Sequence, residues 1–145
     1  MDRKRLDRYD FALESGEKHS RVKRLKEEKL SPFRDMTMKD VFIYAMAIGY
    51  ERGKKVPLKR RTGVIPGNAL RDEDYALVKA IGISQRKDVD ILFEKKEKEL
   101  FKIAEEYANG GIDMLFYQVF GEDPGDPDRK MEQALRDLMA KKRKG

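Results

Sequence analysis

The chain has 145 residues, of which 41% are charged and 39% hydrophobic, and it carries a formal net charge of +6. This length suits one hydrophobic core, and a disordered protein would have fewer hydrophobic residues and charge mostly of one sign. The absence of cysteine excludes disulfides and thiolate metal sites, and no apolar run approaches the roughly 20 residues of a membrane-spanning helix. We therefore expect a soluble, cytoplasmic protein.

Residues 1–30 are expected to form a charged helical arm. Their apolar residues recur at helical spacing in two groups: Leu6, Tyr9 and Leu13, then Val22 and Leu25. Gly16 separates the groups, which indicates two short helices or one interrupted helix. The cations of this arm are offset by nearby glutamates, so we interpret it as a solvated helix surface that docks on the core through its second apolar group.

Residues 31–121 are expected to form the helical core. Thr37 and Asp40 lie three residues apart, as in a capping box, and predict a helix that begins at Met38 and ends near Gly53. Because nearly every position of this helix is apolar, it should be the central helix of the fold.

Six cations and no carboxylate follow this helix, in residues 52–61. They are Arg52, Lys54, Lys55, Lys59, Arg60 and Arg61. Of the 33 basic residues in the chain, the 27 outside this segment match the 27 acidic residues, so the excess charge lies here. Localised positive charge favours a polyanionic partner, most often nucleic acid. The segment has no aromatic residue, which favours the backbone of duplex DNA over stacked single-stranded bases.

The alternative is that these cations form a solvated loop without a ligand. They would then neutralise the acidic residues at 72–74 or those of the linker at 122–128. Proline and glycine in residues 56–68 argue against helix and predict an ordered loop. At most, Val64 and Ile65 would pair with residues 56–58 in a short β-hairpin.

Residues 72–93 resemble a helix-turn-helix. The first helix would begin in an acidic turn and end at Gly82, and the second would begin near Asp88. The residues that would then reach the DNA major groove are Gln85, Arg86 and Lys87. A plain helical hairpin has the same pattern, so both interpretations stay open.

Two further regions complete the predicted helices. A buried helix should end at Gly110 and Gly111 through a left-handed glycine cap, and residues 112–120 should form another short helix, with a strand as the alternative. Residues 122–145 are expected to form an acidic linker and a C-terminal helix whose basic tail complements the helix dipole.

No catalytic motif is present in the sequence. The single histidine, His19, lies in the charged arm, which argues against histidine-based catalysis. Three groups of carboxylates lack a diagnostic metal-site spacing: Asp88 with Asp90, Glu105 with Glu106, and Asp72 with Glu73 and Asp74. No glycine-rich phosphate loop is found. We therefore expect a protein that is not an enzyme and that needs no metal or cofactor.

Several strings in the sequence resemble one small protein family. The most specific are Gly-Tyr-x-Arg-Gly-Lys at residues 49–54 and Glu-Glu-Tyr-Ala-Asn-Gly-Gly at residues 105–111. Over residues 33–115 the chain is similar to dnd system-associated protein 4, a family encoded near DNA phosphorothioation genes. The resemblance implies a setting in DNA modification and defence, and it assigns no catalytic residue.

These observations predict an all-α, mostly helical single domain that acts as a DNA-binding accessory protein of a phosphorothioation system. The alternative is a subunit that docks on a larger DNA-modification or restriction enzyme without binding DNA itself, through residues 105–109 or the acidic linker. The lack of cysteine and tryptophan, with many charges of both signs, is also typical of thermophile proteins.

Overall fold

The computed structural model describes residues 3–86 and 97–121, together with positions 136, 138 and 139. Within these ranges the chain is mostly helical, as predicted, with one two-stranded sheet. The elements are α1 (Arg3–Asp7), β1 (Asp10–Glu14), α2 (Glu17–Glu27), α3 (Met38–Glu51), β2 (Arg61–Pro66), the 3₁₀ turn η1 (Gly67–Ala69), α4 (Asp72–Arg86) and α5 (Glu97–Phe120). No helix among the described residues is both long and apolar enough to cross a membrane.

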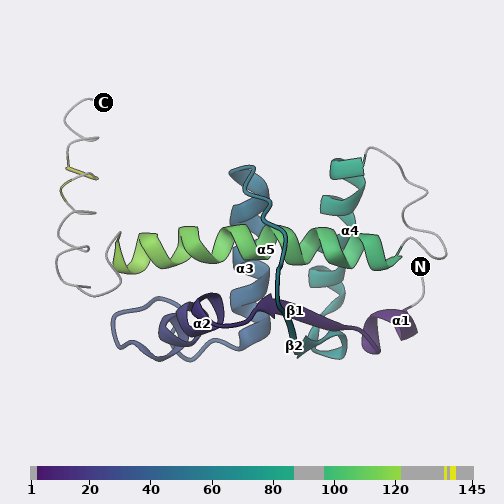
Figure 1. Cartoon of the computed structure of the whole chain (residues 1–145), viewed down its shortest axis with the longest axis horizontal. Coiled ribbons are helices and arrows are strands. Elements are labelled where there is room, and N and C mark those ends of the chain that lie inside the picture. The colour runs from purple at the N-terminus through teal and green to yellow at the C-terminus, as the bar shows by residue number, and fades with distance from the viewer. Residues whose placement is uncertain (1–2, 87–96, 122–135, 137, 140–145) are drawn as a thin grey trace.

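The long helix α5 is the centre of the fold, and α2, α3, α4 and β1 all pack against it (Figure 1). Its buried residues extend from Glu97 to Phe120. The prediction that the helix beginning at Met38 would be central is therefore corrected. That helix, α3, crosses one face of α5 and leaves Tyr44 54% exposed.

Glycines allow α3 and α5 to cross at short distance. A Cβ atom at Gly111 would overlap the carbonyl oxygen of Ala45, and one at Gly49 would overlap that of Tyr107. The predicted helix end at Gly110 and Gly111 is wrong, because α5 continues through both. Packing, rather than a left-handed cap, requires glycine here, and residues 112–120 are helical as the continuation of the same helix.

α3 begins at the predicted cap. The Thr37 side chain accepts a hydrogen bond from the Asp40 amide at 3.2 Å, which satisfies one of the free amides of the first turn. At the other end, Arg52 is the capping residue, and its amide bonds to the Ile48 carbonyl. The basic segment therefore starts where α3 ends.

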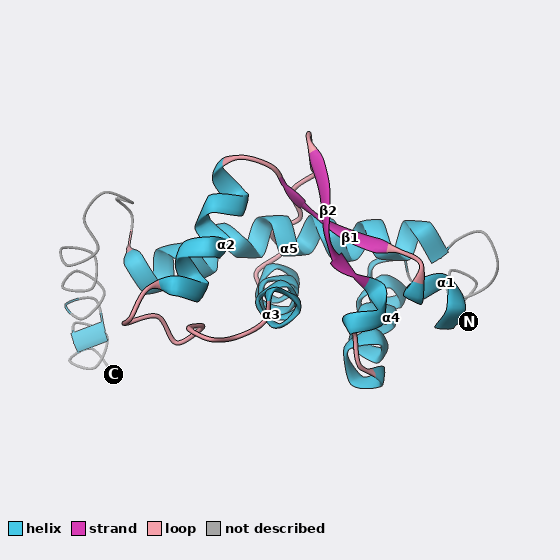
Figure 2. Ribbon diagram, turned by 90° about the horizontal axis from the view of Figure 1, so that it is seen from below, coloured by secondary structure: helices cyan, strands magenta, loops and turns pink. Residues whose placement is uncertain are grey.

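The sheet joins two segments that lie far apart in the sequence. β1 pairs antiparallel with β2, with Phe11 opposite Ile65. The sequence predicts an ordered loop over residues 56–68 with at most a short strand at Val64 and Ile65. The structure has a strand there, within β2, but it pairs with β1 instead of residues 56–58. The predicted helical spacing through Leu13 is also wrong: consecutive residues of β1 are buried, because the strand is covered by α2 and α5 as well as paired with β2. Figure 2 shows both strands crossing beside α5.

The interpretation of α2 as a helix docked on the core is confirmed. Val22 and Leu25 are 1% and 0% exposed. The guanidinium of Arg24 lies 4.7 Å from the centroid of the Phe120 ring, and that of Arg21 lies 5.2 Å from the Phe116 ring. These cations pack on aromatic rings of α5 and so serve the fold.

α4 runs without a break through Gly82 to Arg86. The predicted turn at Gly82 is therefore wrong. Glycine is needed there because a Cβ atom would overlap the side chain of Leu100 on α5. The second helix predicted from Asp88 lies outside the described residues, so the structure does not supply a helix-turn-helix within them.

Candidate nucleic-acid interface

The basic segment leaves the end of α3 and passes over α5 to reach β2. We call residues 52–60 the basic loop. Gly53 has a φ of 65°, a left-handed conformation that glycine adopts without strain, and it turns the chain back toward α5. The Lys54 amide then bonds to the Gly49 carbonyl at 2.8 Å. The start of the loop is thereby fixed to the last turn of α3.

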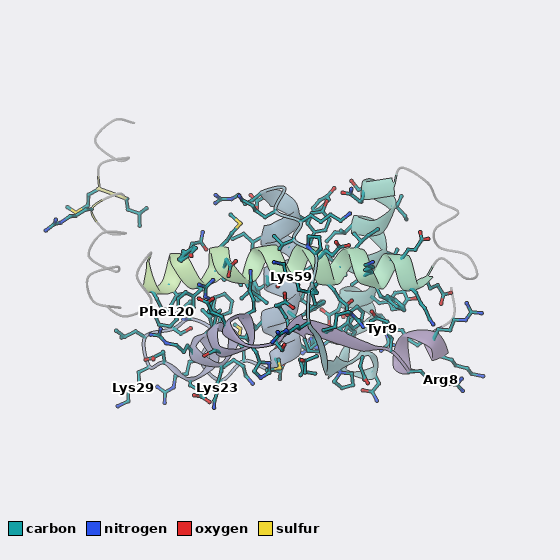
Figure 3. The ribbon with its side chains drawn as sticks, viewed as in Figure 1. Arg8, Tyr9, Lys23, Lys29, Lys59 and Phe120 are labelled. Atoms are coloured by element: carbon teal, nitrogen blue, oxygen red, sulfur yellow. The ribbon has the colours of Figure 1, made fainter. Side chains whose placement is uncertain are left out.

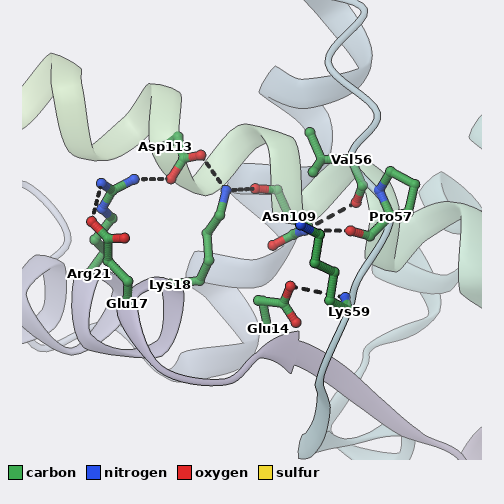
Figure 4. Close-up of polar contacts among 9 residues, drawn as sticks. All are labelled: Glu14, Glu17, Lys18, Arg21, Val56, Pro57, Lys59, Asn109 and Asp113. Carbon is green, nitrogen blue, oxygen red and sulfur yellow. Dashed lines mark hydrogen bonds and ion pairs between the residues drawn. The ribbon is translucent and has the colours of Figure 1, made fainter.

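The middle of the basic loop is hydrogen-bonded to α5. The Val56 amide donates to the Glu106 carbonyl at 3.0 Å. The buried Asn109 amide group donates to the carbonyls of Val56 and Pro57 at 3.1 and 3.4 Å (Figure 4). A Cβ atom at Gly110 would overlap the Lys54 carbonyl, so the loop backbone lies directly on the helix.

The end of the basic loop is held by a carboxylate of β1. Glu14 accepts hydrogen bonds from the amides of Lys59 and Arg60 at 2.9 and 2.5 Å. These bonds hold the pKa of Glu14 below its ordinary value. In return, the Ser15 amide donates to the Arg60 carbonyl at 2.9 Å. Three separate elements therefore fix the loop.

Arg61, at the start of β2, has a structural role that sets it apart from the other cations. Its Nη2 lies 2.7 Å from Oε2 of Glu105, which is 1% exposed. The same carboxylate accepts hydrogen bonds from the Ala12 amide at 2.6 Å and from the Tyr9 hydroxyl at 3.0 Å. Burial, and then the charge of Glu105, raise the pKa of Tyr9 far above its ordinary value, so Tyr9 remains a donor.

The other five cations of the segment point to solvent. Arg52, Lys54, Lys55, Lys59 and Arg60 are exposed, and none forms an ion pair within the described ranges. Lys59 lies over the middle of α5 in Figure 3. Two of the acids proposed to neutralise them pair with other cations: Asp72 with Arg3, and Asp74 with Lys39. The loop therefore presents a group of unpaired positive charges on a fixed backbone.

The C-terminal turn of α4 lies beside the end of α3. The Tyr50 hydroxyl is hydrogen-bonded to Ser84, and the Tyr107 hydroxyl donates to Gln85. Gln85 is exposed at this end of the helix. The structure thus brings Gln85, together with the backbone of Arg86, to the side of the molecule where the basic loop begins, whereas Lys87 lies outside the described residues.

The carboxylates considered for metal binding do not converge in the described part of the chain. No group of three or more His, Asp and Glu side chains there is arranged to hold an ion. The Glu105 carboxylate already forms an ion pair with Arg61. Asp88 and Asp90 lie outside the described residues. Residues 105–109 also do not form the docking surface of the alternative hypothesis, because Glu105 and Asn109 are buried under the sheet and the loop.

Three residues hold the basic loop and Arg61 in place, a role that the sequence analysis assigns to none of them: Glu14, Glu105 and Asn109. A signal for two of them exists. Glu105 lies one position after Ala104 and four before Asn109, within the apolar stripe of α5, so a buried polar role follows from helical periodicity. Glu14 has no such signal, because its partners come from a loop 45 residues away.

A family model described as DNA sulphur modification system-associated protein 4 matches residues 14–144. The match begins at the end of β1 and includes the basic loop, Arg61 and all of α5, so it is longer than the resemblance over residues 33–115. No curated protein and no solved structure is found to match the chain.

Proposed function

The chain belongs to the family of DNA sulphur modification system-associated protein 4, and on that basis we propose that it binds duplex DNA within such a system. The contacts would be made by the basic loop with the phosphate backbone. The observation that carries the proposal is the group of five exposed cations on a backbone fixed by α3, α5 and β1. Little conformational entropy is then lost when the loop binds a ligand.

Backbone contact explains why the loop carries many cations and no base-reading side chain. Lys and Arg that neutralise phosphates release counterions, which gives affinity without sequence preference. Side chains that stack on unpaired bases would be aromatic, and residues 52–60 contain none. Duplex DNA of any sequence is therefore the ligand that best suits the loop.

Gln85, Arg86 and Lys87 are proposed as additional contacts. The end of α4 is tied to α3 and α5 through Tyr50 and Tyr107, close to where Arg52 begins the loop. A duplex lying along the basic loop would pass this corner of the molecule. Contacts there would extend the interface without requiring a helix-turn-helix.

Charge-neutralising variants test the proposal. Lys54→Gln with Lys55→Gln removes two charges from the loop, whereas Lys23→Gln with Lys29→Gln removes two exposed charges far from it (Figure 3). In a titration against a short duplex at about 0.1 M salt, the loop variant should bind at least about ten-fold more weakly. The control should lose less than about three-fold, because distant charges are screened.

Equal losses in the two variants would remove the basic loop from the interface. If the wild-type protein binds no DNA at low salt but co-purifies with a larger enzyme of the system, the alternative function is favoured. That enzyme would then contact a surface other than Glu105 and Asn109, since these side chains are buried.

A further inference from the structure

The centre of the basic loop is apolar although it is open to solvent. Val56 is 37% exposed, Pro57 is exposed and Leu58 is half-buried. Lys54 and Lys55 directly precede this apolar segment, and Lys59 and Arg60 directly follow it. The loop therefore presents a short apolar surface with cations on both sides. These cations would attract an anionic ligand to the apolar surface.

The polar backbone groups of the apolar segment are already used. The Val56 amide bonds to the Glu106 carbonyl, and the carbonyls of Val56 and Pro57 accept bonds from Asn109 (Figure 4). Pro57 has no amide hydrogen to offer. A ligand approaching over Val56 and Pro57 thus meets side-chain carbon in place of these groups.

A phosphorothioate linkage differs from a phosphate in a way that such a surface detects. Both carry one negative charge, so the flanking cations attract them alike. Sulfur is larger and more polarisable than the oxygen that it replaces, and it is a weaker hydrogen-bond acceptor. Moving sulfur from water to an apolar contact therefore costs less free energy than moving oxygen. This difference in desolvation cost favours binding of the sulfur-containing duplex.

We propose that residues 56–58 make the basic loop bind duplexes with phosphorothioate linkages more tightly than unmodified duplexes. This inference rests on the proposed DNA binding and names its preferred substrate. The cations on either side would contact neighbouring phosphates while the sulfur lies on Val56 and Pro57. Burial of about 40 Å² of apolar surface in that contact corresponds to a preference of about five-fold.

The test compares three forms of one short duplex by fluorescence anisotropy at low salt. One form is unmodified, and the others carry a single central phosphorothioate of either configuration. We expect one configuration to bind about five-fold more tightly than the unmodified duplex. Val56→Thr keeps the side-chain shape but replaces a methyl group by a hydroxyl, and it should bring the ratio of the affinities for the modified and unmodified duplexes close to one.

The matched control is Leu30→Thr, which changes an apolar residue that is 73% exposed and lies outside the loop, and it should keep the five-fold ratio. Equal wild-type affinity for all three duplexes would overturn the preference and leave the proposed DNA binding standing. Absence of binding to every duplex would overturn both. If Val56→Thr keeps the five-fold ratio of affinities, the apolar segment does not distinguish sulfur from oxygen.

Discussion

Arg61 and Glu105 form an ion pair in which Nη2 lies 2.7 Å from Oε2, although 44 residues separate them in the chain. The Glu105 side chain is buried and the Arg61 side chain is half exposed. The pair joins the start of β2 to the middle of α5, and Tyr9 and Ala12 bond to the same carboxylate. One of the six cations of the basic segment therefore stabilises the fold that presents the other five.

Arg61→Met should destabilise the protein by about 3 kcal/mol, because it leaves the buried carboxylate of Glu105 without its counter-charge. The measurement is the free energy of unfolding in urea. Arg60→Met is the matched control, since Arg60 is exposed and forms no ion pair within the described ranges, and it should change stability by less than about 0.5 kcal/mol. Similar stabilities of the two variants would contradict the role of Arg61 as the counter-charge of Glu105.

Asn109→Asp should release the basic loop from α5. The substitution keeps the shape of the side chain but points carboxylate oxygens at the carbonyls of Val56 and Pro57, in place of a donor. The loop contains several trypsin sites, so we expect faster cleavage within residues 52–61 by limited proteolysis with mass spectrometry. An unchanged order and rate of cleavage would show that Asn109 does not fix the loop.

Gly111→Ala should cost about 3 kcal/mol or more, because the added methyl group overlaps the Ala45 carbonyl and must push α3 and α5 apart. Gly53→Asn is the comparison: a Cβ atom there meets nothing within 4 Å, and asparagine tolerates the positive φ. Thermal unfolding of both variants distinguishes close helix packing from a general intolerance of glycine replacement. A mild effect of Gly111→Ala would place the helices farther apart than the structure does.

The end of the basic loop should respond to acid through Glu14. Its folded-state pKa is depressed by the amides of Lys59 and Arg60, so the stabilisation is complete above the ordinary Glu value of about 4.3 and is lost as pH falls through the lower folded-state pKa. Amide proton shifts of Lys59 and Arg60, followed by NMR, should titrate with a midpoint below that value. Glu14→Gln should abolish the titration. A midpoint at or above the ordinary value would argue against these hydrogen bonds.

The sequence predicts the helical class and the start of α3 correctly because these depend on local patterns. The Thr37 cap, the acidic start of α4 and the apolar stripe of α5 all act within a few residues of the chain. The position of the five exposed cations also follows from the sequence, since a loop between two elements must lie on the surface.

The errors arise where residues serve distant partners. Gly82, Gly110 and Gly111 have the local appearance of turns, but each gives space to another segment across the fold. β1 could not be inferred because its partner strand lies about 50 residues away in sequence. Arg61 cannot be told apart from its neighbours in the sequence, because only the tertiary structure brings it to Glu105.

The dependence of DNA affinity on salt tests the central claim most directly. If the five exposed cations of the basic loop contact phosphates, a plot of log affinity against log salt concentration for a short duplex should have a slope of about −4.5. Lys54→Gln with Lys55→Gln should reduce the slope to about −2.7. A slope near zero, or no binding at low salt, would contradict the account.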